Sequence, residues 1–143
     1  MLFKLKSARA LRGFTLLELL VVLVILGMLA ALAGPRVMKY ISSSKTDTAK
    51  LQIEELASAL DMYKLEIGRY PNTQEGLQAL VEAPGGATNW NGPYLKKKKV
   101  PKDPWGADYH YAFPGQHGAF DISTLGADGR EGGEGEDKDV VSW

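Results

Sequence analysis

The residues best suited to chemistry lie in an acidic, glycine-rich stretch near the C-terminus, LGADGREGGEGEDKD at residues 125–139. Its carboxylates belong to Asp128, Glu131, Glu134, Glu136, Asp137 and Asp139. Carboxylates without histidine or cysteine favour a hard cation such as Ca²⁺, which takes about six to eight oxygen ligands, backbone carbonyls included. Glycines permit tight turns, so carboxylates and carbonyls from separated positions can converge on one ion.

A second interpretation of this stretch stays open, because its composition also fits a flexible, solvated acidic tail. The EF-hand pattern D-x-[DN]-x-[DN]-G is absent. Elsewhere the chain has no cysteine, no H-E-x-x-H motif and no phosphate-binding glycine loop before a helix. His110 and His117 are isolated, so we interpret both as structural. We therefore expect no enzymatic activity.

A single carboxylate, Glu18, lies in an otherwise uncharged apolar segment, residues 14–33. As a helix this segment is about 30 Å long, which is the thickness of a bilayer core. An acidic side chain costs about 2.5–3.5 kcal/mol at the centre of such a helix, and less near its end. Glu18 therefore either has a functional partner or snorkels to the membrane interface.

The residues before the apolar segment are basic: Lys4, Lys6, Arg9 and Arg12, without an acid among them. The positive-inside rule keeps this end cytoplasmic and sends the C-terminal body across the membrane. A secretory signal peptide cleaved after Ala33 is the alternative, although the long apolar run and Glu18 argue against it. Because the whole chain is neutral, the remainder is acidic, which argues against nucleic-acid binding.

An amphipathic helix is expected beyond the apolar segment. Its apolar residues are spaced four and three apart: Ala49, Ile53, Leu56, Leu60, Tyr63 and Ile67. Gly68 is a suitable stop. The pattern predicts one long helix from about residue 14 to 67, in which Gly34-Pro35 marks either a kink or the boundary between two helices.

The C-terminal part is predicted to be a small α+β body. A short helix is expected at about residues 74–81, and strands at 108–113 and 119–124 flank the turn PGQHG as a hairpin. A third short strand is expected near DVVSW at the end of the chain. Between helix and strands, Lys96–Lys99 is interpreted as a solvated loop; contact with anionic lipid or an acidic neighbour is the alternative.

The segment RGFTLLELLVVLVILGMLAALA resembles the class III signal of type IV pilins and pseudopilins. The resemblance implies that a prepilin peptidase cleaves between Gly13 and Phe14 and N-methylates Phe14. Residues 1–13 are then a leader, and residues 14–33 are the transmembrane and assembly helix. Thr15 and Glu18 belong to the assembly motif, in which Glu18 pairs with the Phe14 amine of a neighbouring subunit. Such pairing offsets the penalty of a carboxylate in lipid.

The body resembles the major-pseudopilin family of type II secretion systems. The motifs are GRYPNTQEGLQAL, WNGPYLKK, PKDPWGADYHYAFPG, FDISTLGADGREGGEGED and the final SW. The family implies a type IV pilin-like α+β fold, in which the long helix packs on a small antiparallel sheet and Ca²⁺ staples the C-terminal loop of the extracytoplasmic body, residues 34–143. The implied ligands are Asp128, Asp137, Asp139 and the Leu125 carbonyl, then a carbonyl near Arg130, and with less support Glu134 and Glu136.

The resemblance also implies a function. A structural subunit would polymerise helically from the bacterial inner membrane, with its body in the periplasm, to move folded proteins across the outer membrane. Its partners would be further copies of itself, minor pseudopilins, the inner-membrane assembly platform and prepilin peptidase, but not nucleic acid. The alternatives are another type IV filament subunit, such as a pilus or DNA-uptake pilin, or a secreted soluble calcium-binding protein.

Overall fold

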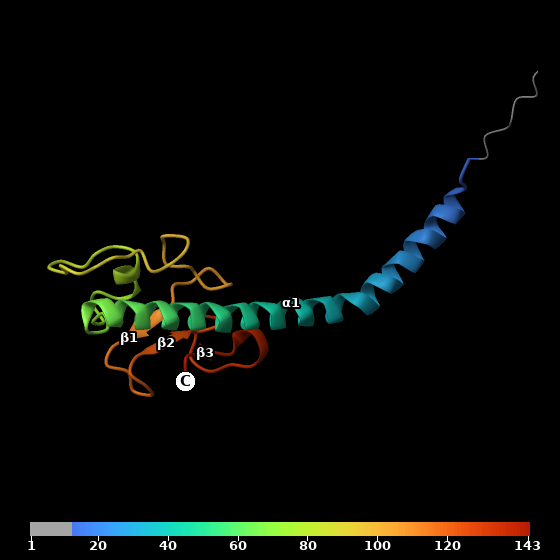
Figure 1. The fold of residues 1–143 in the computed structure, drawn as a ribbon. Helices are drawn as coiled ribbons and strands as arrows, with labels where there is room; N and C mark the ends of the chain where they lie inside the picture. Colours follow the sequence, from blue (N-terminus) through green and yellow to red (C-terminus); the bar gives the residue numbers. More distant parts are fainter. Residues whose placement is uncertain (1–12) are drawn as a thin grey trace, which may run out of the picture. The chain divides into compact units, whose positions relative to one another are not determined.

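The computed structural model describes residues 13–143. Contacts divide the chain after Met38, so the N-terminal part of the long helix is one unit and residues 39–143, the body, are the other. In chain order the elements are α1 (Leu16–Ile67), the 3₁₀ helix η1 (Leu77–Leu80), β1 (His110–Ala112), β2 (Asp121–Thr124), the 3₁₀ helix η2 (Gly135–Asp137) and β3 (Val140–Val141) (Figure 1).

Helix α1 begins and ends close to the residues that the sequence predicts. Pro35 lies inside it, so the alternative of a helix end at Ala33 is wrong. The helix ends before Gly68, which adopts a φ of 86° and donates its N–H to the Lys64 carbonyl at 2.8 Å. A glycine is needed there because side chains disfavour this left-handed conformation.

The chain turns back after α1 around an ion pair. The two terminal nitrogens of the Arg69 guanidinium, Nη1 and Nη2, donate to the Glu75 carboxylate at 2.6 and 2.7 Å. Asn72 and Glu75 also exchange hydrogen bonds between side chain and backbone, each 2.8 Å long. Hydrogen bonding to Arg69 and to the Asn72 backbone lowers the pKa of Glu75. This turn directs the chain toward η1, which is a short 3₁₀ helix in place of the longer helix predicted at residues 74–81.

The sheet is antiparallel with the order β1-β2-β3. Tyr111 pairs with Ile122, and Thr124 pairs with Val140. The hairpin and the third strand lie where the sequence predicts them, but every strand is shorter than its predicted range.

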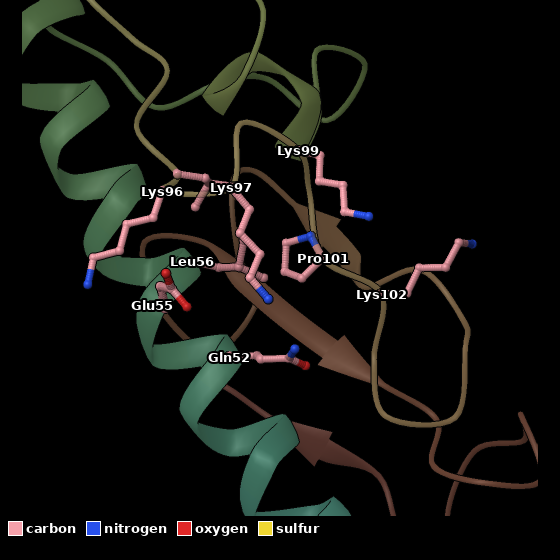
Figure 2. A pocket seen from close by; sticks show the side chains of 9 residues that line it. Gln52, Glu55, Leu56, Lys96, Lys97, Lys99, Pro101 and Lys102 are labelled. Atoms are coloured by element: carbon pink, nitrogen blue, oxygen red, sulfur yellow. The ribbon is translucent and has the colours of Figure 1, made fainter.

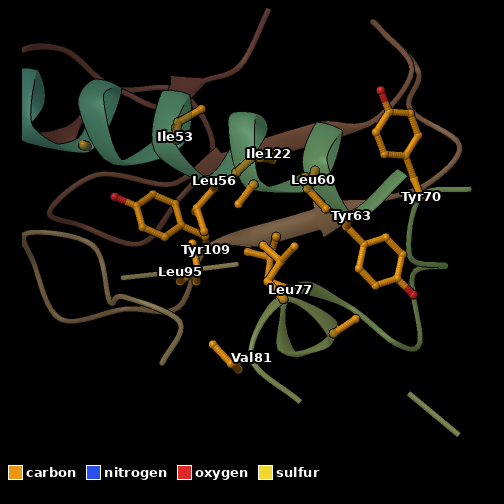
Figure 3. Close-up of a cluster of buried hydrophobic side chains, with 14 of the residues drawn as sticks. Ile53, Leu56, Leu60, Tyr63, Tyr70, Leu77, Val81, Leu95, Tyr109 and Ile122 are labelled. Atoms are coloured by element: carbon orange, nitrogen blue, oxygen red, sulfur yellow. The ribbon is translucent and has the colours of Figure 1, made fainter. Parts of the chain in front are cut away.

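The core forms between the body part of α1, η1 and the sheet. The predicted stripe of α1 is buried from Ala49 to Tyr63, while Ile67 is partly buried. Figure 3 shows Leu56 and Leu60 in one cluster with Leu77 and Ile122. The hydroxyl of Tyr109, the residue directly before β1, also donates to the Gln52 side chain of α1 at 2.6 Å. Helix and sheet are therefore held together by apolar burial and by a cross-element hydrogen bond.

A buried carboxylate joins the loop between η1 and β1, residues 81–109, to the sheet; we call this segment the central loop. Asp103 is 4% exposed. One of its oxygens accepts the backbone N–H groups of Trp105 and Ala107, at 3.0 and 2.7 Å, and the other accepts the hydroxyl of Thr124 in β2. Each donor is matched to an acceptor inside the fold, as buried polar groups require.

Candidate functional site

Thr15 forms the N-cap of α1. Its hydroxyl oxygen accepts the backbone N–H of Glu18 at 3.1 Å, and its carbonyl accepts the N–H of Leu19 at 3.2 Å. Thr15 and Glu18 have the T-x-x-E spacing of a capping box, which indicates the start of a helix. The resemblance assigns Thr15 to assembly and does not include this role. Glu18 lies in the first turn, where the helix dipole favours a negative charge. Gly13 and Phe14 precede the helix and are exposed.

The N-terminal part of α1 has apolar side chains on all its faces. Every residue from 13 to 38 is exposed, and Phe14 and Leu16 are exposed by 84% and 89%. By length and composition, α1 is apolar enough to cross a membrane. A helix that is apolar all round is stable only in lipid or against other helices.

A second apolar surface lies on the body part of α1. Tyr40, Leu51 and Met62 are spaced eleven residues apart, which brings them to one face of the helix. They are exposed by 78%, 66% and 55%, and Leu65 on the same side by 86%. The helical spacing sets this face opposite the buried stripe. We call these four residues the outer stripe of α1.

The C-terminal loop, residues 125–139, folds back on itself through hydrogen bonds donated by its backbone N–H groups. The Ala127 N–H donates to the Glu136 carbonyl at 2.9 Å, and the Gly132 N–H donates to the Asp139 carboxylate at 2.9 Å. Gly126 has a φ of 67°, and a Cβ added there would lie 2.8 Å from the carbonyl oxygens of Glu136 and Asp137. A larger residue at this position would push the two halves of the loop apart.

The predicted calcium ligands lie in this loop in different environments. Asp139 has one carboxylate oxygen, Oδ1, that is buried without a hydrogen-bond partner. Asp128 and Asp137 are exposed, and Asp128 accepts the N–H of Arg130 at 3.0 Å. Glu134 is exposed and Leu125 is partly buried.

These residues suit Ca²⁺ in their chemistry but are not gathered into a cluster. Across residues 13–143, no three acidic, histidine or cysteine side chains converge closely enough to hold a metal ion. A buried carboxylate oxygen without a partner is costly, and a cation would satisfy it. Asp139 is therefore the predicted ligand that the structure supports best.

Glu136 differs from the other predicted ligands because its carboxylate is paired with a cation on another element, Lys45 of α1. Its Oε1 lies 3.1 Å from Lys45 Nζ on α1 and accepts the indole N–H of Trp105 at 3.3 Å. The Lys45 ammonium, followed by Trp105, lowers the pKa of Glu136. The sequence offers no local sign of these contacts, because both partners are distant along the chain.

Lys96–Lys99 are exposed, as expected for a solvated loop. Three of them line a pocket of about 310 Å³ together with Lys102 and with Gln52 and Glu55 of α1 (Figure 2). His117 stacks on Trp143, with ring centroids 3.9 Å apart, and lies 3.1 Å from the Asp121 carboxylate. This contact holds the end of the chain against the hairpin turn, in agreement with a structural role.

Two family models match the chain over most of its length. Residues 36–143 match the model described as "Type II secretion system (T2SS), protein G". The chain belongs to this family. Residues 9–34 match the "Prokaryotic N-terminal methylation motif". The family is one of structural pseudopilins, and the apolar helix with this motif is consistent with single-pass anchoring in the inner membrane.

Curated relatives and a solved structure agree with the family. The chain is 53% identical over 135 residues to the type II secretion system core protein G of Pseudomonas aeruginosa, covering 92% of this chain and 94% of that protein. It is 47% identical over 141 residues to the protein of the same name from Vibrio cholerae, covering 96% and 95%.

The crystal structure of the major pseudopilin from the type 2 secretion system of enterohaemorrhagic Escherichia coli is 34% identical, with a TM-score of 0.62, and covers 74% of this chain and 92% of that one. The predicted fold, a long helix on a small antiparallel sheet, is confirmed. The predicted family is confirmed as well.

Proposed function

We propose that this pseudopilin polymerises from the inner membrane into a helical filament that drives export of folded proteins across the outer membrane. The observation that carries the proposal is the N-terminal part of α1, which is apolar on every face and has a single carboxylate, Glu18, in its first turn. In the free subunit this helix would lie in lipid, and in the filament neighbouring helices would cover it. The body then lies in the periplasm.

Processing at the N-terminus would prepare this helix for assembly. Cleavage by prepilin peptidase between Gly13 and Phe14 creates an α-amino group close to Thr15 and Glu18. The amine of one subunit is the cation that Glu18 of the next subunit requires. Because each subunit has both groups, the contact is head-to-tail and extends into an open polymer.

The outer stripe of α1 supports assembly through the body as well. Large apolar side chains are exposed along one face of α1, away from the subunit's own core. Burying them against further copies would remove this apolar surface from water. Minor pseudopilins and the inner-membrane assembly platform are the remaining partners that we propose.

The intact mass and the N-terminal residue of the membrane-extracted protein test this function. We expect a chain that begins at Phe14 and carries one added methyl group. A soluble chain that begins at Gly34 would instead support the alternative, a secreted calcium-binding protein, and would contradict assembly through α1.

We also propose that Ca²⁺ binds in the C-terminal loop. Binding would bring the side chains of Asp128, Asp137 and Asp139 together on the ion, with backbone carbonyls from Leu125 and the Arg130 region. Bound Ca²⁺ would fix a loop that buries little apolar surface of its own. The buried, unpartnered Oδ1 of Asp139 supports this proposal.

Replacing Asp128 by asparagine tests the calcium site. Asparagine keeps an acceptor for the Arg130 N–H but removes the ligand charge. We expect saturating Ca²⁺ to stabilise the wild type by about 2.7 kcal/mol when the ion is at a hundred times its Kd, and to stabilise the variant much less. Thermal unfolding across a calcium titration measures this difference. Glu131→Gln, an exposed change in the same loop, is the control, and identical calcium responses of wild type and Asp128→Asn would refute the site.

A further inference from the structure

Glu136 connects three parts of the body that are far apart in the sequence. Its carboxylate contacts Lys45 on α1 and Trp105 in the central loop, at 3.1 and 3.3 Å. Its backbone carbonyl accepts the N–H of Ala127, at 2.9 Å, from the first half of the C-terminal loop. One residue thus fixes the loop to the helix and also holds the two halves of the loop together.

These contacts place Glu136 close to acidic residues in both halves of the loop. Asp128 directly follows Ala127, and Asp137 directly follows Glu136, while Asp139 comes two residues later. The backbone of Glu136 and Asp137 packs closely against Gly126. Movement of Glu136 away from α1 would therefore displace the residues beside Asp128 as well as those beside Asp137.

We propose that Glu136 is a positioning residue for the calcium loop and not one of its ligands. Its ion pair with Lys45 anchors the loop on α1 before a cation arrives, so less conformational entropy is lost when the ion binds. Groups that orient metal ligands commonly contribute tenfold or more to affinity. The inference rests on the proposed calcium site, and it makes Lys45, a cation on the helix, a determinant of calcium affinity.

The substitution Lys45→Met separates the two roles, because they predict opposite signs. If Glu136 were a ligand, loss of Lys45 would release its carboxylate for the ion and remove a repelling charge, and calcium would bind more tightly. If Glu136 positions the loop, loss of Lys45 frees the loop and calcium binds more weakly. We expect the Kd of Lys45→Met to rise about tenfold and that of Lys45→Arg, which preserves the ion pair, to stay near the wild-type value.

Calorimetric titration of the full chain in detergent with CaCl₂ measures these affinities. Glu136→Gln is expected to weaken binding about tenfold, and clearly more than Glu131→Gln, which removes the same charge from an exposed position of the loop. Thermal unfolding in EDTA gives a second readout. There, Lys45→Met and Glu136→Gln should lower the Tm while Glu131→Gln does not, because the anchor needs no metal.

The outcomes distinguish this inference from the calcium proposal itself. A wild type that takes up no Ca²⁺ would overturn both. A wild type that binds Ca²⁺, together with unchanged or tighter binding by Lys45→Met, would overturn the positioning role and leave the calcium site in place. Equal losses in Glu136→Gln and Glu131→Gln would also overturn it, because the loss would then follow charge alone.

Discussion

The variant Glu18→Ala is expected to insert in the membrane and to lose its leader, yet to form at least tenfold fewer filaments than the wild type. Alanine removes a carboxylate that costs free energy in lipid, so insertion of the subunit should be as good or better. Assembly should fail because the Phe14 amine of the neighbour is then left unpaired in an apolar bundle. Removing one partner of such a buried pair costs about 3–5 kcal/mol.

The measurement compares filaments sheared from cells with the amount of processed subunit in the membrane. Thr15→Ala is the matched control, because it removes the cap hydroxyl that Glu18 N–H donates to and keeps the carboxylate. Loss of a cap costs about 1 kcal/mol, so this variant should assemble with only a modest defect. Normal filament yield from Glu18→Ala would refute the pairing. Equal defects in both variants would assign the effect to the start of the helix.

The elements that were predictable from the sequence are those fixed by local periodicity. The four-and-three spacing from Ala49 onward identifies the buried face of α1, because a helix repeats every 3.6 residues. The hairpin around PGQHG follows from turn chemistry between two strand-like runs. The residues before η1 are less regular than predicted, because Gly76 has a φ of 58° and interrupts the α-helix predicted there.

The chemistry of the loop was predictable only in part. Composition identifies the carboxylates, but burial decides what each one does, and burial depends on contacts across the fold. Glu136 and Asp139 look alike in the sequence, yet one is paired with Lys45 and the other has an unpartnered oxygen. The sequence gives no sign of the role of Asp103 either, because an aspartate in the segment PKDPWG also fits an exposed turn.

Asp103→Ala is expected to destabilise the body by about 3 kcal/mol or more. The substitution leaves two backbone N–H groups and the Thr124 hydroxyl without an acceptor at a site that is 4% exposed. Each buried donor without a partner costs about 1–3 kcal/mol, while the hydrogen bonds themselves contribute less. The loss should be larger than for removal of a surface ion pair, and it should separate the central loop from β2.

Urea unfolding followed by tryptophan fluorescence measures this loss, because Trp90, Trp105 and Trp143 all lie in the body. Asp108→Ala is the control: its carboxylate is exposed and pairs with Lys102 on the surface, so we expect a change within about 0.5 kcal/mol. Asp103→Asn should fall between the two, since its amide oxygen still accepts the Trp105 and Ala107 N–H groups but lacks the charge. If Asp103→Ala were as stable as Asp108→Ala, water would have to satisfy the three donors, and the central loop would then be held to the sheet by apolar packing alone.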